Sequence, residues 1–128
     1  MAPAFLSLAE ALEIHRDQIE RYGGEAGIRD LRLLQSALAM PAAMFDKRYL
    51  HGDLFEMAAA YLFHITQDHP FVDGNKRTGA VAALVFLSLN NVEIDADEKA
   101  FERIVLSVAE GKTRKADVAQ FFRAHAGR

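Results

Sequence analysis

The chain has 128 residues, of which 51% are hydrophobic and 26% are charged, a composition typical of one folded domain over residues 1–128 and not of a disordered chain. It contains no cysteine, which excludes disulfides and thiolate metal sites. The net charge of −3 argues against direct nucleic-acid binding, so any site for an anion has to be local.

Two helices are predicted in the first third of the chain. Ser7 followed by Glu10 has the form of a capping box that opens a helix, and Gly23 ends that helix. Asp30 is a candidate cap for a second, shorter helix, which stops before Pro41.

Four further helices are predicted in the rest of the chain, after a segment over 42–52 that shows no clear pattern. They cover 53–68 with Asp53 as a candidate cap, 76–91, 97–111 with Gly111 just past the end, and 113–126, while 92–97 is a candidate extended piece. The helix over 76–91 is apolar on nearly every side, as expected of a helix surrounded by others. We therefore predict an all-α fold, a compact bundle of about six helices around a central apolar helix.

We expect neither a secretory signal nor a membrane-spanning helix in this sequence. The first ten residues lack a basic region followed by a long apolar run. The apolar run "AVAALVFLSL" (80–89) is shorter than the roughly 20 residues that a membrane-spanning helix needs. We expect a soluble, cytoplasmic protein with no membrane partner.

The stretch "HPFVDGNKRTG" (69–79) places two cations, Lys76 and Arg77, at the predicted start of a helix. The helix dipole disfavours cations there by roughly 0.3–1 kcal/mol each, and a bound phosphate would reverse the sign of that effect. Gly74 permits a positive φ, so a turn of successive amides can form an anion-binding concavity. Asn75 is expected to cap the new helix with its side-chain oxygen.

The same stretch offers a base and a metal ligand. Asp73 supplies a hard oxygen suited to Mg²⁺, and His69 is a natural general base near neutral pH. Each feature alone has an ordinary explanation, such as helix capping or a solvated charged face. Their order and density predict a site for phosphoryl or nucleotidyl transfer, although the spacing is not that of a Walker-type loop.

These residues resemble a known signature. "HPFVDGNKR" is similar to the motif of the Fic/Doc superfamily, and "NKR" in place of "NGR" resembles its Doc (death-on-curing) branch. The likeness also includes "YGGEAGIRDLRLLQSAL" (22–38) and "VFLSLNNVEIDADE" (85–98), and covers roughly residues 5 to 125.

The resemblance implies roles for individual residues. His69 would deprotonate a hydroxyl of a target protein, and Phe71 would anchor the loop in the core. The implied catalytic residues are His69, Asp73 and Arg77; the implied nucleotide- and phosphate-binding residues are Gly74, Asn75, Lys76, Arg77 and Thr78; and Asp73 is the implied Mg²⁺ ligand.

The departures from the motif bear on the reaction. Fic adenylyltransferases usually show G-N-G-R-x-x-R, whereas this chain has Lys76 at the second glycine and Ala80 at the second arginine. The Doc resemblance instead implies an ATP-dependent protein kinase, a toxin of a type II toxin–antitoxin system whose target is translation elongation factor Tu. Two alternatives stay open, a Fic-type protein adenylyltransferase and a catalytically degenerate fold kept for antitoxin or regulatory binding.

Control of the activity is expected to come from a second protein. The nearest match to the S/T-x-x-x-E-G/N inhibitory helix of some Fic proteins is "SVAEG" (107–111), which is one residue too short. One residue rotates a helix by about 100°, so the glutamate would face elsewhere. The resemblance implies a Phd-like antitoxin, whose disordered C-terminal segment folds on the toxin.

Other polar and aromatic residues have structural interpretations. His64 is expected to pack, and His15, His51 and His125 to face solvent. Arg29 and Asp30 are expected to form a cap and an ion pair. Phe121 and Phe122 are predicted core residues, or alternatively the lining of a groove for a partner helix.

Overall fold

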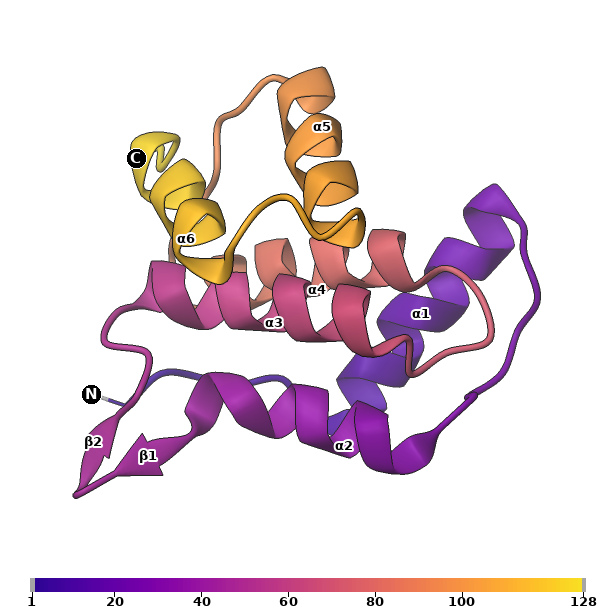
Figure 1. The fold of residues 1–128 in the computed structure, drawn as a ribbon, viewed down its shortest axis with the longest axis horizontal. Coiled ribbons are helices and arrows are strands. Elements are labelled where there is room, and N and C mark those ends of the chain that lie inside the picture. Colours follow the sequence, from indigo (N-terminus) through magenta and orange to yellow (C-terminus); the bar gives the residue numbers. More distant parts are fainter. Residues whose placement is uncertain (1, 128) are drawn as a thin grey trace.

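The computed structural model describes residues 2–127 and confirms the predicted bundle of six α-helices (Figure 1). The elements are α1 (Leu8–Tyr22), α2 (Leu31–Ala39), the 3₁₀ turn η1 (Met40–Ala42), β1 (Met44–Phe45), β2 (Arg48–Tyr49), α3 (Leu54–Asp68), α4 (Asn75–Leu89), α5 (Glu98–Ala109) and α6 (Lys115–Ala124). No helix in this range is long and apolar enough to cross a membrane.

Three predicted caps stand where the sequence places them. Ser7 and Glu10 form a reciprocal capping box at the start of α1, with hydrogen bonds of 3.1 and 2.8 Å. Asp30 and Asp53 each accept a hydrogen bond from the amide three residues further on, at 3.1 and 2.8 Å. Each cap satisfies an amide that has no acceptor within its own helix, which fixes where the helix begins.

The core lies between α3 and α4, with α5 and α6 on one side of the pair and α2 on the other (Figure 1). The predicted central helix, α4, therefore shares the centre of the bundle with α3. The two helices approach closely at Gly79, where an added Cβ would lie 2.9 Å from Oγ1 of Thr66 and 3.1 Å from the carbonyl of Leu62. A larger residue at position 79 would push the helices apart.

Within the unassigned segment 42–52 the chain forms a small antiparallel hairpin, in which Met44 pairs with Tyr49 and Phe45 pairs with Arg48. Its two-residue turn has positive φ at both positions, 51° and 64°, as in the common tight hairpin turns. The predicted extended piece over 92–97 appears as a single bridge between Ile94 and Ala126, which ties the chain before α5 to the end of α6.

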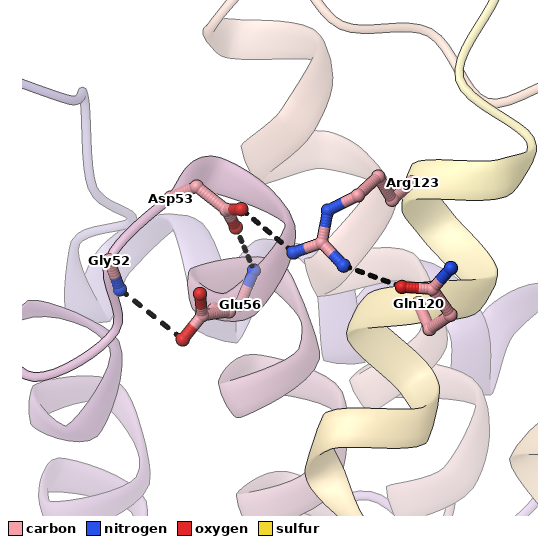
Figure 2. Close-up of polar contacts among 5 residues, drawn as sticks. All are labelled: Gly52, Asp53, Glu56, Gln120 and Arg123. Atoms are coloured by element: carbon pink, nitrogen blue, oxygen red, sulfur yellow. Dashed lines mark hydrogen bonds and ion pairs between the residues drawn. The ribbon is translucent and has the colours of Figure 1, made fainter.

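A polar network joins the start of α3 to α6 on the outside of the bundle (Figure 2). Arg123 donates to Oδ2 of Asp53 and to Oε1 of Gln120, both at 2.8 Å. Partial burial of Asp53 opposes its ionisation, but the hydrogen bonds from Arg123 and from the Glu56 amide outweigh it and lower the pKa of Asp53. The cap of α3 is thus also a tie between two helices.

Candidate active site

His69 is the residue that ends α3, and it has an unusual backbone conformation. Its φ of 50° and ψ of 56° lie in the left-handed region, which a residue other than glycine adopts only when its surroundings impose it. Arg29 binds the backbone here, donating Nε to the carbonyl of His69 at 2.6 Å and Nη2 to that of Asp68 at 2.9 Å. The side chain of His69 is exposed.

Arg29 therefore caps the end of α3, while the carboxylate of Asp30 caps the start of α2. The predicted cap is confirmed, but the predicted ion pair between these two residues is wrong, because none joins them in the part of the chain that the structure covers. The backbone of this segment also pairs with the motif loop, since Val72 donates to the carbonyl of Gly27 at 3.0 Å. The connection between α1 and α2 is thereby hydrogen-bonded to the motif loop.

The motif loop is held by the side chain of Asn75, which accepts from the amide of Phe71 and donates to its carbonyl, both at 3.0 Å. Phe71 is fully buried, as the family resemblance implied. The expectation that Asn75 caps α4 is wrong, because its amide group is used on the loop and Gly74, at a φ of 76°, is the capping residue. Gly74 has no side chain to offer, so the first amides of α4 stay available to a ligand.

The carboxylate of Asp73 is oriented by two backbone amides. Gly74 donates to Oδ1 at 2.9 Å and Glu25 donates to Oδ2 at 3.3 Å. These amides lower the pKa of Asp73, with a smaller contribution from the charge of Arg77. An added Cβ at Gly24 would lie 2.8 Å from Oδ2, so this close approach requires glycine there. The result is an exposed, ionised oxygen pair of the kind that Mg²⁺ prefers.

The guanidinium group of Arg77 uses only some of its hydrogen-bond donors within residues 2–127. Its Nη2 donates to the carbonyl of Gly23 at 2.8 Å, and its guanidinium carbon lies 5.5 Å from the ring centre of Tyr22. Its Nε is buried without a hydrogen-bond partner among residues 2–127. A buried, unpaired donor on a charged group is costly, so this arrangement favours an acceptor supplied from outside the chain.

These groups line one cavity of about 590 Å³. Its lining consists of His69, Val72, Asp73, Gly74, Asn75, Lys76, Arg77 and Ala109. The structure thus brings together every predicted site residue except Thr78, which is fully buried and whose hydroxyl has no partner in the described range. Ala109, at the end of α5, was missed because no local pattern relates it to the motif.

Among residues 2–127 there is no group of three or more histidine, cysteine or acidic side chains that could hold a metal ion. Mg²⁺ commonly binds through one or two carboxylates together with oxygens of a substrate, and Asp73 is the carboxylate that could serve such an ion here. The open amides, the free Nε of Arg77 and the ionised Asp73 fit a nucleotide with its metal.

A second, smaller cavity of about 190 Å³ adjoins the first between α4 and α5. It shares Lys76 and Arg77 with the larger cavity, and its remaining lining is mainly apolar: Ala80, Phe101, Glu102, Val105 and Leu106. Phe122 is buried in the core, as predicted, and Phe121 is partly buried against the ring of Phe101.

The prediction that His15 and His51 face solvent is wrong, since they are only 5% and 8% exposed. His15 lies on the buried face of α1 with Ala11 and Gln18. Its spacing of four residues from Ala11 was a signal for burial that the neighbouring charged residues obscured.

His64 packs between α3 and α6, as predicted, and accepts from the Lys115 ammonium at 2.9 Å. Burial, then the charges of Lys115 and His51, lower its pKa to about 4. His64 is therefore neutral near neutral pH and plays a packing role, away from the residues that line the larger cavity.

The sequence matches known proteins over most of its length. A model of the Fic/DOC family matches residues 5–87. The chain is 42% identical over 76 residues to a protein named Toxin Doc from Mycolicibacterium smegmatis, a match that covers 59% of this chain and 58% of that toxin. It is 31% identical over 118 residues to the Protein kinase doc of Escherichia phage P1, a match that covers 92% of each chain.

Proposed function

The chain belongs to the Doc branch of the Fic/Doc family, and on that premise we propose that it is a toxin that phosphorylates a protein hydroxyl with ATP. The observation that supports this most directly is the larger cavity, where an exposed histidine, an ionised carboxylate and an uncapped helix start lie together. The proposed target is translation elongation factor Tu, so the toxin would stop translation in the cytoplasm.

The two cations at the start of α4 need a negative partner. The dipole of α4 disfavours Lys76 and Arg77, and the buried Nε of Arg77 has no acceptor in the described chain. A phosphate at this position would be held by the amides at the start of α4 and by the guanidinium of Arg77, which lines the cavity. Lys76 is exposed and adds a mobile positive charge at the rim.

In the proposed reaction His69 acts as the general base. It accepts the proton of the target hydroxyl as the hydroxyl oxygen attacks, and the exposure of its side chain leaves room for a protein substrate. Arg77 would hold the transferred group by charge-assisted hydrogen bonds, and Asp73 would hold a Mg²⁺ ion, which would supply positive charge to the phosphates. The new bond joins the hydroxyl oxygen to the γ-phosphorus of ATP, the bond between that phosphorus and the β–γ bridging oxygen breaks, and ADP leaves.

Phosphate transfer is favoured over AMP transfer by the surroundings of Ala80. This residue takes the position of the second arginine of adenylyltransferases, and it lies in the apolar part of the groove beside Lys76 and Arg77. Lys76 and Arg77 are the only cations among the residues that line this groove. A distal phosphate would therefore be bound more weakly here than by the two arginines of the G-N-G-R-x-x-R pattern.

The test is transfer of label to elongation factor Tu from ATP that carries ³²P at either the γ- or the α-phosphate. We expect label only from the γ position and a mass increase of one phosphate on the target. Label from the α position would show adenylyl transfer instead. No label from either position, with correctly folded protein, would favour the degenerate binding fold.

We also propose that a Phd-like antitoxin binds in the groove between α4 and α5. A helical segment of that partner would bury its apolar face on Phe101, Val105 and Leu106, of which Leu106 is 47% exposed in the chain alone. An acidic residue of the partner would then face Lys76 and Arg77. Occupation of this groove would place the inhibitor beside the phosphate site, in agreement with the lack of a matching inhibitory helix in the sequence.

A further inference from the structure

We propose that His15 is a positioning residue for the motif loop, which acts by holding the carbonyl of Asp73. By this contact it fixes the orientation of the peptide between Asp73 and Gly74, and through that peptide the orientation of the Asp73 carboxylate. The catalytic consequence rests on the proposed function, whereas the structural consequence can be measured without it.

The contact between His15 and the loop is both polar and apolar. Nε2 of His15 lies 2.9 Å from the carbonyl oxygen of Asp73, and because a carbonyl only accepts, Nε2 carries the proton. The imidazole is stacked on the ring of Phe71 with 3.8 Å between the ring centres and 4° between the planes. His15 is 5% exposed, so few other positions are open to its ring.

The peptide between Asp73 and Gly74 links this contact to the site. In a planar trans peptide the carbonyl and the following N–H point in opposite directions. Because His15 holds the Asp73 carbonyl toward α1, the Gly74 amide points away from α1 and reaches Oδ1 of Asp73 at 2.9 Å. The same amide makes the largest contribution to keeping that carboxylate ionised.

Without such a tie this peptide would be free to rotate. Gly74 has a φ of 76° and no Cβ, so its backbone has access to conformations that other residues lack. The neighbouring positions are held by other groups, since Asn75 holds Phe71 and Gly27 holds Val72. A rotated peptide would turn a carbonyl oxygen toward the anion site and remove the hydrogen bond to Asp73.

The first measurement is the hydrogen exchange of the Gly74 amide in the full chain, by NMR. His15→Phe keeps a ring to stack on Phe71 but has no N–H, and we expect the Gly74 amide to lose its protection. His15→Gln has an amide N–H of similar reach and is expected to restore protection. Gln18→Leu, at a second buried polar position of α1, is the matched control and should leave the Gly74 amide unchanged.

The second measurement is the Mg²⁺ concentration for half-maximal phosphate transfer to elongation factor Tu. Loss of a group that orients a metal ligand typically costs about 10–100-fold in metal affinity or activity, so His15→Phe should raise this concentration by about that factor. His15→Gln should return it toward the wild-type value, and the KM for the target protein should stay unchanged in both variants.

Two results would overturn the proposal. The first is a Gly74 amide that stays protected from exchange in folded His15→Phe. The second is a His15→Gln variant whose Gly74 amide and Mg²⁺ dependence are as impaired as in His15→Phe, because the ring would then be only a packing group. If His15→Phe does not fold, His15→Asn replaces it in the experiment. The asparagine side chain is too short to reach the carbonyl of Asp73, so this variant also lacks the hydrogen bond. Absence of transfer by the wild-type chain would refute the proposed function, while the exchange of the Gly74 amide would still decide the role of His15.

Discussion

Lys76 and Arg77 follow one another in the sequence, but their surroundings differ. Lys76 is exposed, whereas Arg77 is half-buried, bound to the carbonyl of Gly23 and left with one buried N–H unpaired. A bound phosphate can therefore form a fixed hydrogen bond with Arg77 and only a screened charge interaction with Lys76. At the scale of single residues, Arg77 is expected to dominate nucleotide binding.

The first prediction concerns this difference. ATP with Mg²⁺ should raise the melting temperature of the wild-type chain. When the ligand is at ~100 times its Kd, the expected increase in the free energy of unfolding is about 2.7 kcal/mol. Arg77→Ala should abolish most of that shift, because it removes the buried donor. The measurement is thermal unfolding with and without ATP and Mg²⁺. Arg103→Ala, an exposed arginine of α5 outside the larger cavity, is the matched control, and an equal loss in both variants would place the nucleotide elsewhere.

The second prediction concerns His69. His69→Ala should lower phosphate transfer by about 10²–10⁴-fold, which is the usual contribution of a general base. The fold should persist, because the side chain is exposed and Arg29 binds the backbone of this residue and not its ring. Transfer of γ-phosphate and circular dichroism are measured together. His125→Ala at the end of α6 is the control, and full activity of a folded His69→Ala protein would contradict the assigned role.

At the scale of elements, the start of α3 combines a cap with a cross-link. Asp53 accepts from the amide of Glu56 within its own helix and from the guanidinium of Arg123 on α6 (Figure 2). The two functions are separable, because asparagine retains the cap but loses the charge. Since the side chains of both Asp53 and Arg123 are 40% exposed, solvent and salt weaken the ion pair.

The third prediction is the pH dependence of this cross-link. The pKa of Asp53 is lowered in the folded chain, so its ion pair contributes stability above the unfolded-state pKa, near 4, and this contribution is lost as the pH falls through the folded-state value. Wild type should be more stable than Asp53→Asn at pH 7, and the difference should shrink as the pH falls below the unfolded-state pKa, near 4, and vanish below the folded-state value.

Urea unfolding of both proteins at several pH values measures this difference. Asp17→Asn breaks the exposed pair with Arg21 within α1 and serves as the control, with a smaller expected effect at pH 7. A difference between wild type and Asp53→Asn that does not shrink as the pH falls below the unfolded-state pKa, near 4, would rule out the ion pair as its source.

At the scale of the whole molecule, two adjoining cavities meet at Lys76 and Arg77. The larger one contains the proposed catalytic groups, and the smaller one is mainly apolar and lies between α4 and α5. Apart from Lys76 and Arg77, which line both cavities, the proposed catalytic groups and the apolar residues proposed for inhibitor binding line different cavities. This arrangement suggests that inhibition and catalysis can be changed independently.

The fourth prediction follows from that separation. The chain expressed alone should arrest bacterial growth, and coexpression of its antitoxin should restore growth. Leu106→Glu should keep the toxicity but escape neutralisation, because it places a charge in the apolar groove without altering the larger cavity. If the folded wild-type chain is harmless when expressed, the proposed function is contradicted. If the antitoxin neutralises Leu106→Glu as effectively as wild type, the antitoxin binds elsewhere.

Local sequence patterns determined much of this protein. Several features were predictable because they depend on residues close together in the sequence. They are the caps at Ser7, Asp30 and Asp53, the number of helices and the conformation of Gly74. The motif also determined most of the candidate site, since His69 through Arg77 are adjacent in the chain and the turn that joins α3 to α4 keeps them together.

Only the tertiary structure decided the rest. Asn75 was predicted as a cap because its local sequence allows it. In the structure its side chain instead makes two hydrogen bonds with the backbone of the buried Phe71. His15, Arg29 and Ala109 reach the site from α1, the α1–α2 connection and α5, at separations that no helical period links to the motif. Such contacts depend on how the helices pack against one another, and packing is determined by the whole set of buried side chains and not by any short segment.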